Sequence, residues 1–407
     1  MALAARAVEG HIDMESAAGS RELTAPLVLI MAAATGLAVA SNYFAQPLLP
    51  TVAKALSLSP AHAGVIVTTA QLGYAAGLLF LVPLGDLLER RGLIVVMSLL
   101  SAAGLLTTAL APTLGVVLLG TALTGLFSVV AQILVPFAAT LAAPERRGRV
   151  VGTVMSGLLL GILFARTVAG ALASLGSWRA VYFVGAGAMV AATFVLRRAL
   201  PRHHDPVDLT YAGLLRSIFA LFREEPVLRV RALIGAAAFG TFSVFWTSMA
   251  FPLAAPPHLM PPATIGLFGL AGAAGALAAS GAGRLADRGE GARATGGGLL
   301  LLLVSWLPLA LVRHSLAAFV LGVLLLDLAV QGVHISNQAA IYRLRPEARN
   351  RLTAAYMTSY FLGGAAGSLA SAAAYSRFGW PGVAAVGAAF SACGGAVWVV
   401  AQRRVRA

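Results

Sequence analysis

Long apolar runs separated by short polar segments recur along the whole chain of 407 residues. Most runs hold about 20 residues, the length of a helix that crosses the hydrocarbon core of a bilayer. Backbone N–H and C=O groups find no water partners in lipid, so each run is expected to be a helix. The pattern predicts an all-α membrane protein with twelve spans, near residues 25–48, 62–84, 93–111, 114–141, 150–174, 179–197, 230–253, 264–283, 296–312, 315–340, 352–374 and 380–401.

Composition and charge distribution support this interpretation. The chain is 59% hydrophobic and only 11% charged, whereas soluble proteins carry about 25% charged residues. The net charge is +14, but most basic residues lie in the tails or in the loops after even-numbered spans. Only Lys54, Arg179, Arg313 and Arg377 lie in the opposite loops. This asymmetry predicts a bacterial inner-membrane protein with both termini in the cytoplasm, and it argues against binding to nucleic acid.

The chain also contains an internal repeat, because residues 144–187 match residues 346–389 at a constant offset of about 200 residues. Six predicted spans separate the two copies, so both copies lie on the same side of the membrane. The sequence therefore predicts two parallel six-helix bundles. The matched pairs are Pro144 and Pro346, Glu145 and Glu347, Arg147 and Arg349, Arg149 and Arg351, Met155 and Met357, Gly161 and Gly363, Trp178 and Trp380, and Gly185 and Gly387.

The segments outside the bundles differ in composition. Residues 1–24 and 402–407 are expected to be cytoplasmic tails around bundles at 25–198 and 230–401. The linker at 199–229 is polar at first, and then alternates apolar and polar residues at helical spacing between Asp208 and Arg223. This second part predicts an amphipathic helix along the membrane interface, with an ordinary loop as the alternative.

Two short charged loops lie at equivalent places in the two halves. The loop after span 2 reads Pro83-Leu84-Gly85-Asp86-Leu87-Leu88-Glu89-Arg90-Arg91, and its counterpart reads Gly283-Arg284-Leu285-Ala286-Asp287-Arg288. Both resemble G-x-L-[GA]-D-R-x-G-R-R, the signature of the major facilitator superfamily. In that family the loop clasps the cytoplasmic ends of helices and helps to set the outward-facing state. The resemblance implies a conformational gate at Asp86, Arg90, Arg91, Asp287 and Arg288.

Three further segments resemble the branch of this family that exports drugs and metabolites in exchange for protons, and in particular the relatives of its nucleoside and sugar exporters. They are residues 42–50, 245–247 and 331–338. Gly157, Gly161 and Gly170 have the spacing of the antiporter motif, although Arg166-Thr167 replaces its Gly-Pro pair and Gln132 stands in the span that often carries an arginine. The glycines also suit close helix packing. The resemblance implies a twelve-helix secondary transporter of a small organic solute.

The tenth span carries an ionisable stripe. Asp327, Gln331, His334 and Gln338 follow one another at steps of four, three and four, so they share one helix face. An acid inside a span is a candidate functional residue. Asp327 can carry the coupled proton, form a fixed contact with Arg166, or bind substrate. His334 is a second candidate for proton coupling and also for contact with substrate.

Other polar and aromatic side chains in the spans are candidate substrate contacts. Arg166 offers a permanent cation, either to Asp327 or to an anionic group of the substrate. The remaining candidates are uncharged hydrogen-bonding or stacking groups, which together suit a neutral, partly aromatic solute. The full set is Asn42, Tyr43, Gln46, Gln132, Arg166, Trp246, Gln331, His334, Asn337 and Gln338.

Several functions are excluded by residue content. Lys54, the single lysine, does not stand in a phosphate-binding G-x-x-x-x-G-K-[ST] loop, so ATP is not expected to be a partner. No His, Cys or acid cluster has metal-ligand spacing, and no nucleophile and base stand together, so neither a cofactor nor an enzyme is expected. The partners expected are a small organic substrate, protons and the lipid bilayer, with the protein as a monomer. An importer or facilitator of the same fold, and a non-transporting lipid-handling or sensory protein, remain alternatives.

Overall fold

The computed structural model describes residues 24–203, 210–278, 291–345 and 348–406, and these residues are almost entirely helical. The predicted tail at residues 1–23 lies outside the described part. In chain order, the helices are α2 (Ala25–Ala40), η1 (Gln46–Leu48), α3 (Leu49–Ala55), α4 (Pro60–Phe80), η2 (Val82–Asp86), α5 (Arg90–Leu110), α6 (Leu114–Phe127), η3 (Ser128–Val130), α7 (Ala131–Leu141), η4 (Pro144–Arg146), α8 (Arg147–Ser174), α9 (Ala180–Ala199), α10 (Tyr211–Glu224), α11 (Pro226–Ser248), α12 (Ala250–Ala254), α13 (Pro262–Ala278), α15 (Gly291–Val304), α16 (Trp306–Ala310), α17 (Leu316–Ile341) and α18 (Arg349–Arg406).

The predicted membrane spans are present as helices. Within the described residues, nine helical segments are long and apolar enough to cross a bilayer, and two shorter apolar helices lie at Ala25–Ala40 and Pro262–Gly272. The last long segment, α18, contains two helices that meet at Gly379, where φ is 63°. Together these make twelve spans, so the all-α, twelve-helix architecture is confirmed.

Several spans are interrupted where the sequence pattern predicts continuous helices. The chain leaves the helix after Ala40, at Met249 and at Ser305. A proline cannot donate a backbone hydrogen bond to the carbonyl four residues earlier, and its ring crowds that carbonyl. Pro252 and Pro308 each follow three residues after such a break, which accounts for the short helices α12 and α16.

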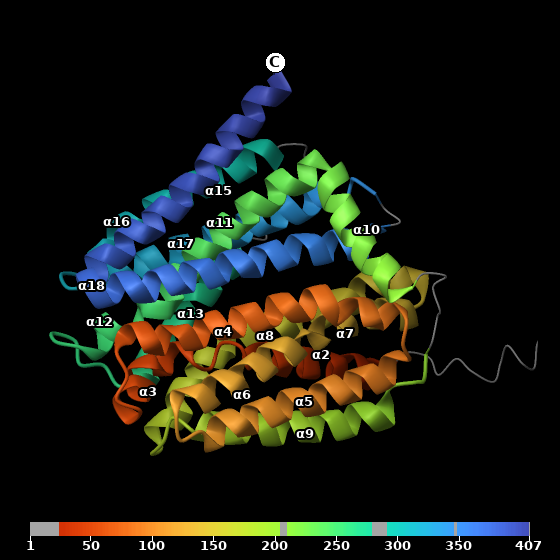
Figure 1. Cartoon of the computed structure of the whole chain (residues 1–407), viewed down its shortest axis with the longest axis horizontal. Helices are drawn as coiled ribbons and strands as arrows, with labels where there is room; N and C mark the ends of the chain where they lie inside the picture. The colour runs from red at the N-terminus through yellow and green to blue at the C-terminus, as the bar shows by residue number, and fades with distance from the viewer. Residues whose placement is uncertain (1–23, 204–209, 279–290, 346–347, 407) are drawn as a thin grey trace, which may run out of the picture.

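The helices form two groups, which Figure 1 shows as a lower group from α2 to α9 and an upper group from α11 to α18. Within the first group α2 packs on α8, and α4 and α5 pack on α6; within the second α11 packs on α18, and α13 and α15 pack on α17. The two groups meet where α4 packs on α18 and where α8 packs on α13.

The repeated glycines lie at equivalent contacts in the two groups. A Cβ on Gly161 of α8 would strike the carbonyl oxygen of Gly36 in α2, and one on Gly363 of α18 would strike that of Ala236 in α11. Gly157 likewise packs against the backbone of Ala32. Close helix packing is therefore confirmed as a role of these glycines.

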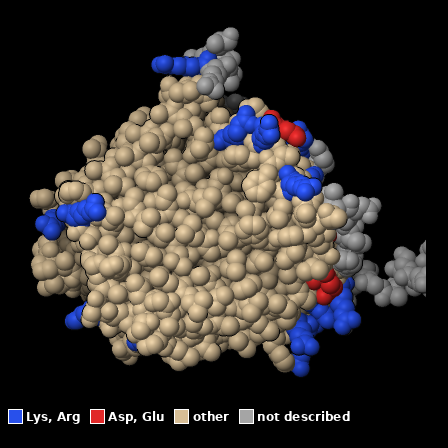
Figure 2. Space-filling model, viewed as in Figure 1, with Lys and Arg blue, Asp and Glu red and all other residues tan. Residues whose placement is uncertain are grey.

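Most charged side chains of the described residues lie at the surface, and Arg166 and Asp327 are buried exceptions. Figure 2 shows a broad apolar face, with lysine, arginine and acidic residues gathered at its rim. Large apolar side chains such as Leu110, Leu300 and Leu307 are exposed. Such a belt of exposed apolar side chains suits contact with lipid.

The segment between the two groups contains a helix, α10, which buries Leu214, Ile218 and Leu221 and leaves Phe219 exposed. The start of this segment is attached to the first group through Glu89, the N-cap of α5. Its carboxylate accepts hydrogen bonds from the backbone N–H groups of Arg91, Gly92 and His203. Burial opposes ionisation of Glu89, but these three hydrogen bonds outweigh it and lower the pKa of the carboxyl below its usual range.

Candidate transport cavity

A cavity with a volume of 910 Å³ lies between the two groups of helices. Small-molecule sites in proteins occupy about 300–1,000 Å³. The side chains of Asp86, Arg90 and Arg351 line one end, near the arginine-containing loops around residues 82–90, 142–149 and 342–349, which we call the basic end. Tyr43, Arg166 and Asp327 line the inner end, deep within the helices.

Beyond the inner end the two groups are in direct contact, and we call this contact the seam. Thr68 of α4 and Ser368 of α18 share a buried hydrogen bond of 2.8 Å. In α8 the Thr167 hydroxyl donates to the carbonyl oxygen of Gly266 in α13 at 3.1 Å. A Cβ on Gly266 would lie only 2.5 Å from the carbonyl oxygen of Arg166. Among the described residues, the backbones of the two groups therefore touch just beyond the inner end of the cavity.

Arg166 lies at the inner end of the cavity and is only 3% exposed. Its Nε donates to Oε1 of Gln46 at 2.7 Å, and its guanidinium carbon lies 3.8 Å from the ring centroid of Trp246 and 4.9 Å from that of Tyr43. One guanidinium nitrogen, Nη2, has no hydrogen-bond partner among the described residues. Aromatic faces and one amide thus hold this cation and leave it a free donor.

Asp327 approaches the same place from α17 and is 5% exposed. Its Oδ2 has no hydrogen-bond partner in the described part of the chain, and neither does the indole N–H of Trp246. Among the described residues, the ion pairs join Arg345 to Glu224 and to Glu225. Asp327 and Arg166 therefore form no direct ion pair in this conformation. The structure leaves an acid and a base buried close together without pairing them.

Two glycines of α13 position both charged groups. A Cβ on Gly269 would lie 3.1 Å from Cβ of Arg166, and a Cβ on Gly272 would lie 3.0 Å from Oδ2 of Asp327 and 2.9 Å from the Trp246 ring. Residues three apart are neighbours on one helix face. This face of α13 therefore lies against both side chains, and Trp246 lies beside the charged groups of both.

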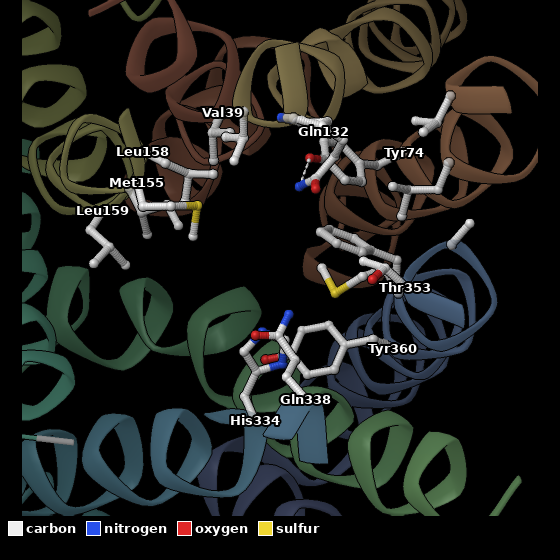
Figure 3. A pocket seen from close by; sticks show the side chains of 18 of the residues that line it. Val39, Tyr74, Gln132, Met155, Leu158, Leu159, His334, Gln338, Thr353 and Tyr360 are labelled. Atoms are coloured by element: carbon white, nitrogen blue, oxygen red, sulfur yellow. Dashed lines mark hydrogen bonds between the residues drawn. The ribbon is translucent and has the colours of Figure 1, made fainter. Parts of the chain in front are cut away.

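The polar stripe of α17 lines one wall of the cavity. Gln331, His334 and Gln338 all contribute to the lining, as Asp327 does at its inner end. Figure 3 shows His334, Gln338 and Tyr360 together on this wall, opposite Gln132 and Tyr74. Across the cavity the Gln132 amide donates to the Tyr74 hydroxyl at 3.2 Å. The lining between the two charged ends thus combines amides, one imidazole and aromatic rings with many aliphatic side chains.

Four of the candidate residues lie behind the cavity wall instead of in it. Gln46 and Trp246 contact Arg166 as described above. Asn42 donates to the Ser128 hydroxyl at 2.6 Å, and Asn337 lies among Arg231, Tyr356 and other residues of the second group. The lining of the cavity does not include these four residues. Gln46 and Trp246 support Arg166, which does line it, whereas Asn42 and Asn337 bind residues outside the lining.

The gate residues are separated at the open end. Arg90 donates to the carbonyl oxygen of Gly85 and to the Thr140 hydroxyl, both within the first group, and Arg91 donates to the carbonyl oxygen of Leu200. Asp86 lies within electrostatic reach of Arg90 and of Arg351, which belongs to the second group. Asp287 and Arg288 lie outside the described residues.

Sequence reasoning missed three residues of this region. Tyr74 and Tyr360 line the cavity, and the Tyr360 ring stacks on Phe239 with centroids 4.1 Å apart. A tyrosine within an apolar run carries no periodic signal that separates a cavity face from a lipid face. The third is Arg231, a half-buried cation near the start of α11 that donates hydrogen bonds to Thr295 and Asn337. Its place so close to a predicted span boundary hid it.

An all-helical membrane protein with a solute-sized cavity between two groups of helices has the architecture of a secondary transporter. The family model described as Major Facilitator Superfamily matches residues 31–307 and again 233–407. The chain belongs to this superfamily.

Individual proteins that are similar to this chain also carry the description of transporters. Uncharacterized transporter YgaY of Escherichia coli O157:H7 is 59% identical over 379 residues, which covers 93% of this chain and 96% of that protein. A transporter of Streptomyces coelicolor is 34% identical over 90% of this chain and 85% of that protein. In fold, the chain resembles a bacterial homologue of the human lysosomal transporter Spinster, with a TM-score of 0.78 at 16% identity over 95% of this chain and 98% of that one.

Proposed function

We propose that this protein exports a small organic solute across the bacterial inner membrane, in exchange for protons. The observation that carries the proposal is the 910 Å³ cavity, which reaches from the basic end to a buried, unpaired acid and base. Its lining is mostly apolar and aromatic, with a few amides. This chemistry favours a neutral, partly aromatic solute over a strongly charged one.

Orientation follows from charge. The basic end carries Arg90, Arg146 and Arg345, and segments rich in arginine stay in the cytoplasm. With the basic end cytoplasmic, the cavity opens inward and is closed toward the outside. This is the state in which an exporter takes up its substrate. Alternation with an outward-open state, reached by opening the seam and closing the basic end, would release that substrate.

Coupling to protons is assigned to Asp327. It is an acid within a span, and one carboxylate oxygen has no hydrogen-bond partner among the described residues. A group that moves between a closed, apolar setting and an open, hydrated one can release and rebind a proton. Because Arg166 is held by Gln46 and by aromatic rings, the arginine does not need Asp327 to remain ionised in order to stay in place.

The test is flux in proteoliposomes that contain the purified protein. A panel of drugs and metabolites is screened by counterflow at equal pH, and each active compound is then tested under an imposed pH gradient. Accumulation of a compound against its gradient, driven by protons and abolished by a protonophore, supports the proposal. Counterflow without any response to the pH gradient identifies a facilitator instead, and absence of flux for the whole panel contradicts transport of this class of solute.

A further inference from the structure

A chain of buried hydrogen bonds runs from Arg231 to the cavity wall. The Arg231 guanidinium donates to Oδ1 of Asn337 at 3.2 Å, and Nδ2 of Asn337 lies 3.4 Å from the Tyr356 hydroxyl. That hydroxyl lies 3.0 Å from Nδ1 of His334. Asn337 is 0% exposed and Tyr356 is 1% exposed, so water does not substitute for any of these partners. Each link therefore has a definite donor and a definite acceptor.

The direction of the chain is set at its buried end. A guanidinium has only N–H groups, so it can only donate. The Asn337 atom that faces it must be the carbonyl oxygen, and the amide nitrogen must then face away. This nitrogen also donates to the backbone oxygen of Arg231 at 3.3 Å, which agrees with the same orientation. Arg231 itself is held by the Thr295 hydroxyl at 2.8 Å.

The same logic continues to the histidine. An amide nitrogen cannot accept, so the Tyr356 oxygen accepts from Asn337 and retains one proton to donate. Within the described residues, Nδ1 of His334 is the acceptor in reach of this proton. If Nδ1 carried a proton itself, the Tyr356 hydroxyl would be left as a buried donor without an acceptor, which is unfavourable. This holds for the Nδ1–H tautomer and for the imidazolium cation alike.

We propose that His334 is a neutral imidazole with its proton on Nε2, and that this N–H is a specificity-determining donor to a hydrogen-bond acceptor of the substrate. His334 lines the cavity, and its Nε2 has no hydrogen-bond partner among the described residues (Figure 3). The ring of Tyr360 lies 4.8 Å away, centroid to centroid, and offers an aromatic face beside the donor. The substrate class is a planar, uncharged molecule with a carbonyl oxygen or an unprotonated ring nitrogen.

This assignment rests on the proposed function for its substrate, but the state of His334 does not. The groups around the ring are Tyr356 and Tyr360 on α18, Arg231 behind Asn337, and Asp327 two turns away on α17. Tyr356 and Asn337 are positioning residues, because they act on the substrate only through His334. Proton coupling then belongs to Asp327 and not to His334.

Nitrogen-15 NMR of the full-length protein, labelled in its seven histidines, measures the tautomer directly. The His334 signals are assigned by their loss in His334→Gln. We expect an unprotonated Nδ1 and a protonated Nε2 that persist between about pH 5 and pH 8, the range in which an ordinary histidine titrates. Tyr356→Phe should remove this preference for one tautomer. Tyr375→Phe is the control and should leave it unchanged, because Tyr375 lies elsewhere on α18, where its ring stacks on Phe251 of α12. A protonated Nδ1 in the unaltered protein overturns the proposal.

Two matched probes test the substrate class. Pyrazine and benzene are uncharged, planar rings of the same size, and of the two only pyrazine carries hydrogen-bond acceptors, which are its unprotonated ring nitrogens. Titration with pyrazine should shift the His334 Nε2 signal more than titration with benzene, and Tyr356→Phe should reduce this difference. Equal responses to the two probes, including none, overturn the assigned substrate class. A confirmed tautomer together with absence of flux for every compound would instead contradict the proposed function alone.

Discussion

At the scale of single residues, the unusual feature is a buried acid and a buried base that lie close together without an ion pair. Arg166 is satisfied in part by Gln46 and by two aromatic rings, whereas Oδ2 of Asp327 has no hydrogen-bond partner among the described residues. Burial of charge is costly unless the charge is paired. Such an arrangement suits a site that gains its missing partners from a substrate or a proton.

Asp327→Asn tests this arrangement. The amide keeps the shape and hydrogen-bonding capacity of the carboxyl group but cannot titrate, so flux driven by a pH gradient should be lost while counterflow at equal pH remains. The protein should fold normally, because Arg166 has partners of its own. Both fluxes are measured in proteoliposomes, and thermal unfolding is followed in parallel.

Two outcomes would contradict this prediction. Gradient-driven transport at the wild-type rate by well-folded Asp327→Asn would remove the residue from coupling. Poor folding that is rescued by a second change, Arg166→Gln, would show that the two residues form a structural pair, since removal of one partner from a buried ion pair costs about 3–5 kcal/mol.

At the scale of helices, α13 is placed by glycines that face the charged site. Gly272 lies against Trp246 and Asp327, and Gly269 lies against Arg166. Prolines interrupt two of the neighbouring spans, so the short helices α12 and α16 continue the paths of α11 and α15. Glycines thus allow close contact at α13, and prolines interrupt the backbone between α11 and α12 and between α15 and α16.

Gly272→Ala should disturb the site without abolishing the fold. Its new Cβ would lie 2.9 Å from the Trp246 ring and 3.0 Å from Oδ2 of Asp327, so one of them must move. Overpacking of this kind costs about 1–3 kcal/mol. We expect a lower melting temperature and a loss of flux that exceeds the loss of folded protein. Gly297→Ala on α15 is the matched control, because its Cβ would meet nothing within 4 Å, and equal effects of the two changes would contradict the prediction.

Glu89→Ala tests the cap that joins α5 to the linker. Loss of an N-cap costs about 1 kcal/mol, so the melting temperature at neutral pH should fall. The folded carboxyl has a pKa below its ordinary value of 4.5, since three backbone N–H groups bind the ionised form. Its stabilising effect is therefore full above that ordinary value and is lost as the pH falls through the lower, folded pKa.

The difference between Glu89→Ala and the unaltered protein should accordingly shrink in acid. Melting temperatures measured from neutral to strongly acidic pH follow this change, with Glu145→Ala in an exposed loop as the control. A difference that is the same at every pH would assign the effect to packing instead of to the charged cap.

The same scale shows what the sequence could and could not predict. Apolar runs specify the spans, because the bilayer demands helices, and the helical period places Asp327, Gln331 and His334 on one face of α17. Contacts between distant helices leave no such pattern. The sequence therefore does not tell that Asn42 binds Ser128, or that Tyr360 faces the cavity and not lipid. The prolines that break α11 and α15 are visible in the sequence, but the apolar pattern runs through them without interruption and predicts continuous helices.

At the scale of the whole molecule, the two groups of helices are in contact at the seam and apart at the basic end. This asymmetry defines the conformation, and the gate residues are where it must change. Asp86 and Arg351 line the open end from opposite groups. Their charges already attract one another in this conformation, and the attraction grows as the two residues approach.

Orientation of the molecule is testable by labelling. In a Cys393→Ala background, a cysteine at Arg147 should react only from the cytoplasm, and one at Lys54, which is exposed at the opposite end, only from the periplasm. The reason is the excess of arginine at the basic end. A membrane-impermeant maleimide added to intact cells makes the measurement. Reaction at position 147 under these conditions would reverse the proposed direction of opening.

Asp86→Asn should shift the protein toward the conformation described above. The change removes the electrostatic attraction to Arg351, which we expect to favour closure. The two residues form no direct ion pair among the described residues, so the loss should alter stability by less than about 1 kcal/mol. Spin labels at positions 146 and 349, one in each group, report the width of the basic end by electron–electron distance measurement. We expect a larger share of long distances than in the unaltered protein. An unchanged distribution, equal to that of Glu145→Gln, would show that Asp86 does not act as a gate.

Arg166 belongs to the seam through its backbone and to the site through its side chain. Its carbonyl oxygen packs against Gly266, and its guanidinium binds Gln46 and faces the cavity. Opening of the seam must therefore move the guanidinium, so the free energy of binding at the site differs between the two conformations. By linkage, a solute bound to Arg166 changes the balance between those conformations by the same factor by which the conformations differ in affinity. Measurements of solute affinity and of the conformational balance should therefore report the same coupling free energy. The backbone of Arg166 connects this energy to the seam, and its side chain connects it to the site.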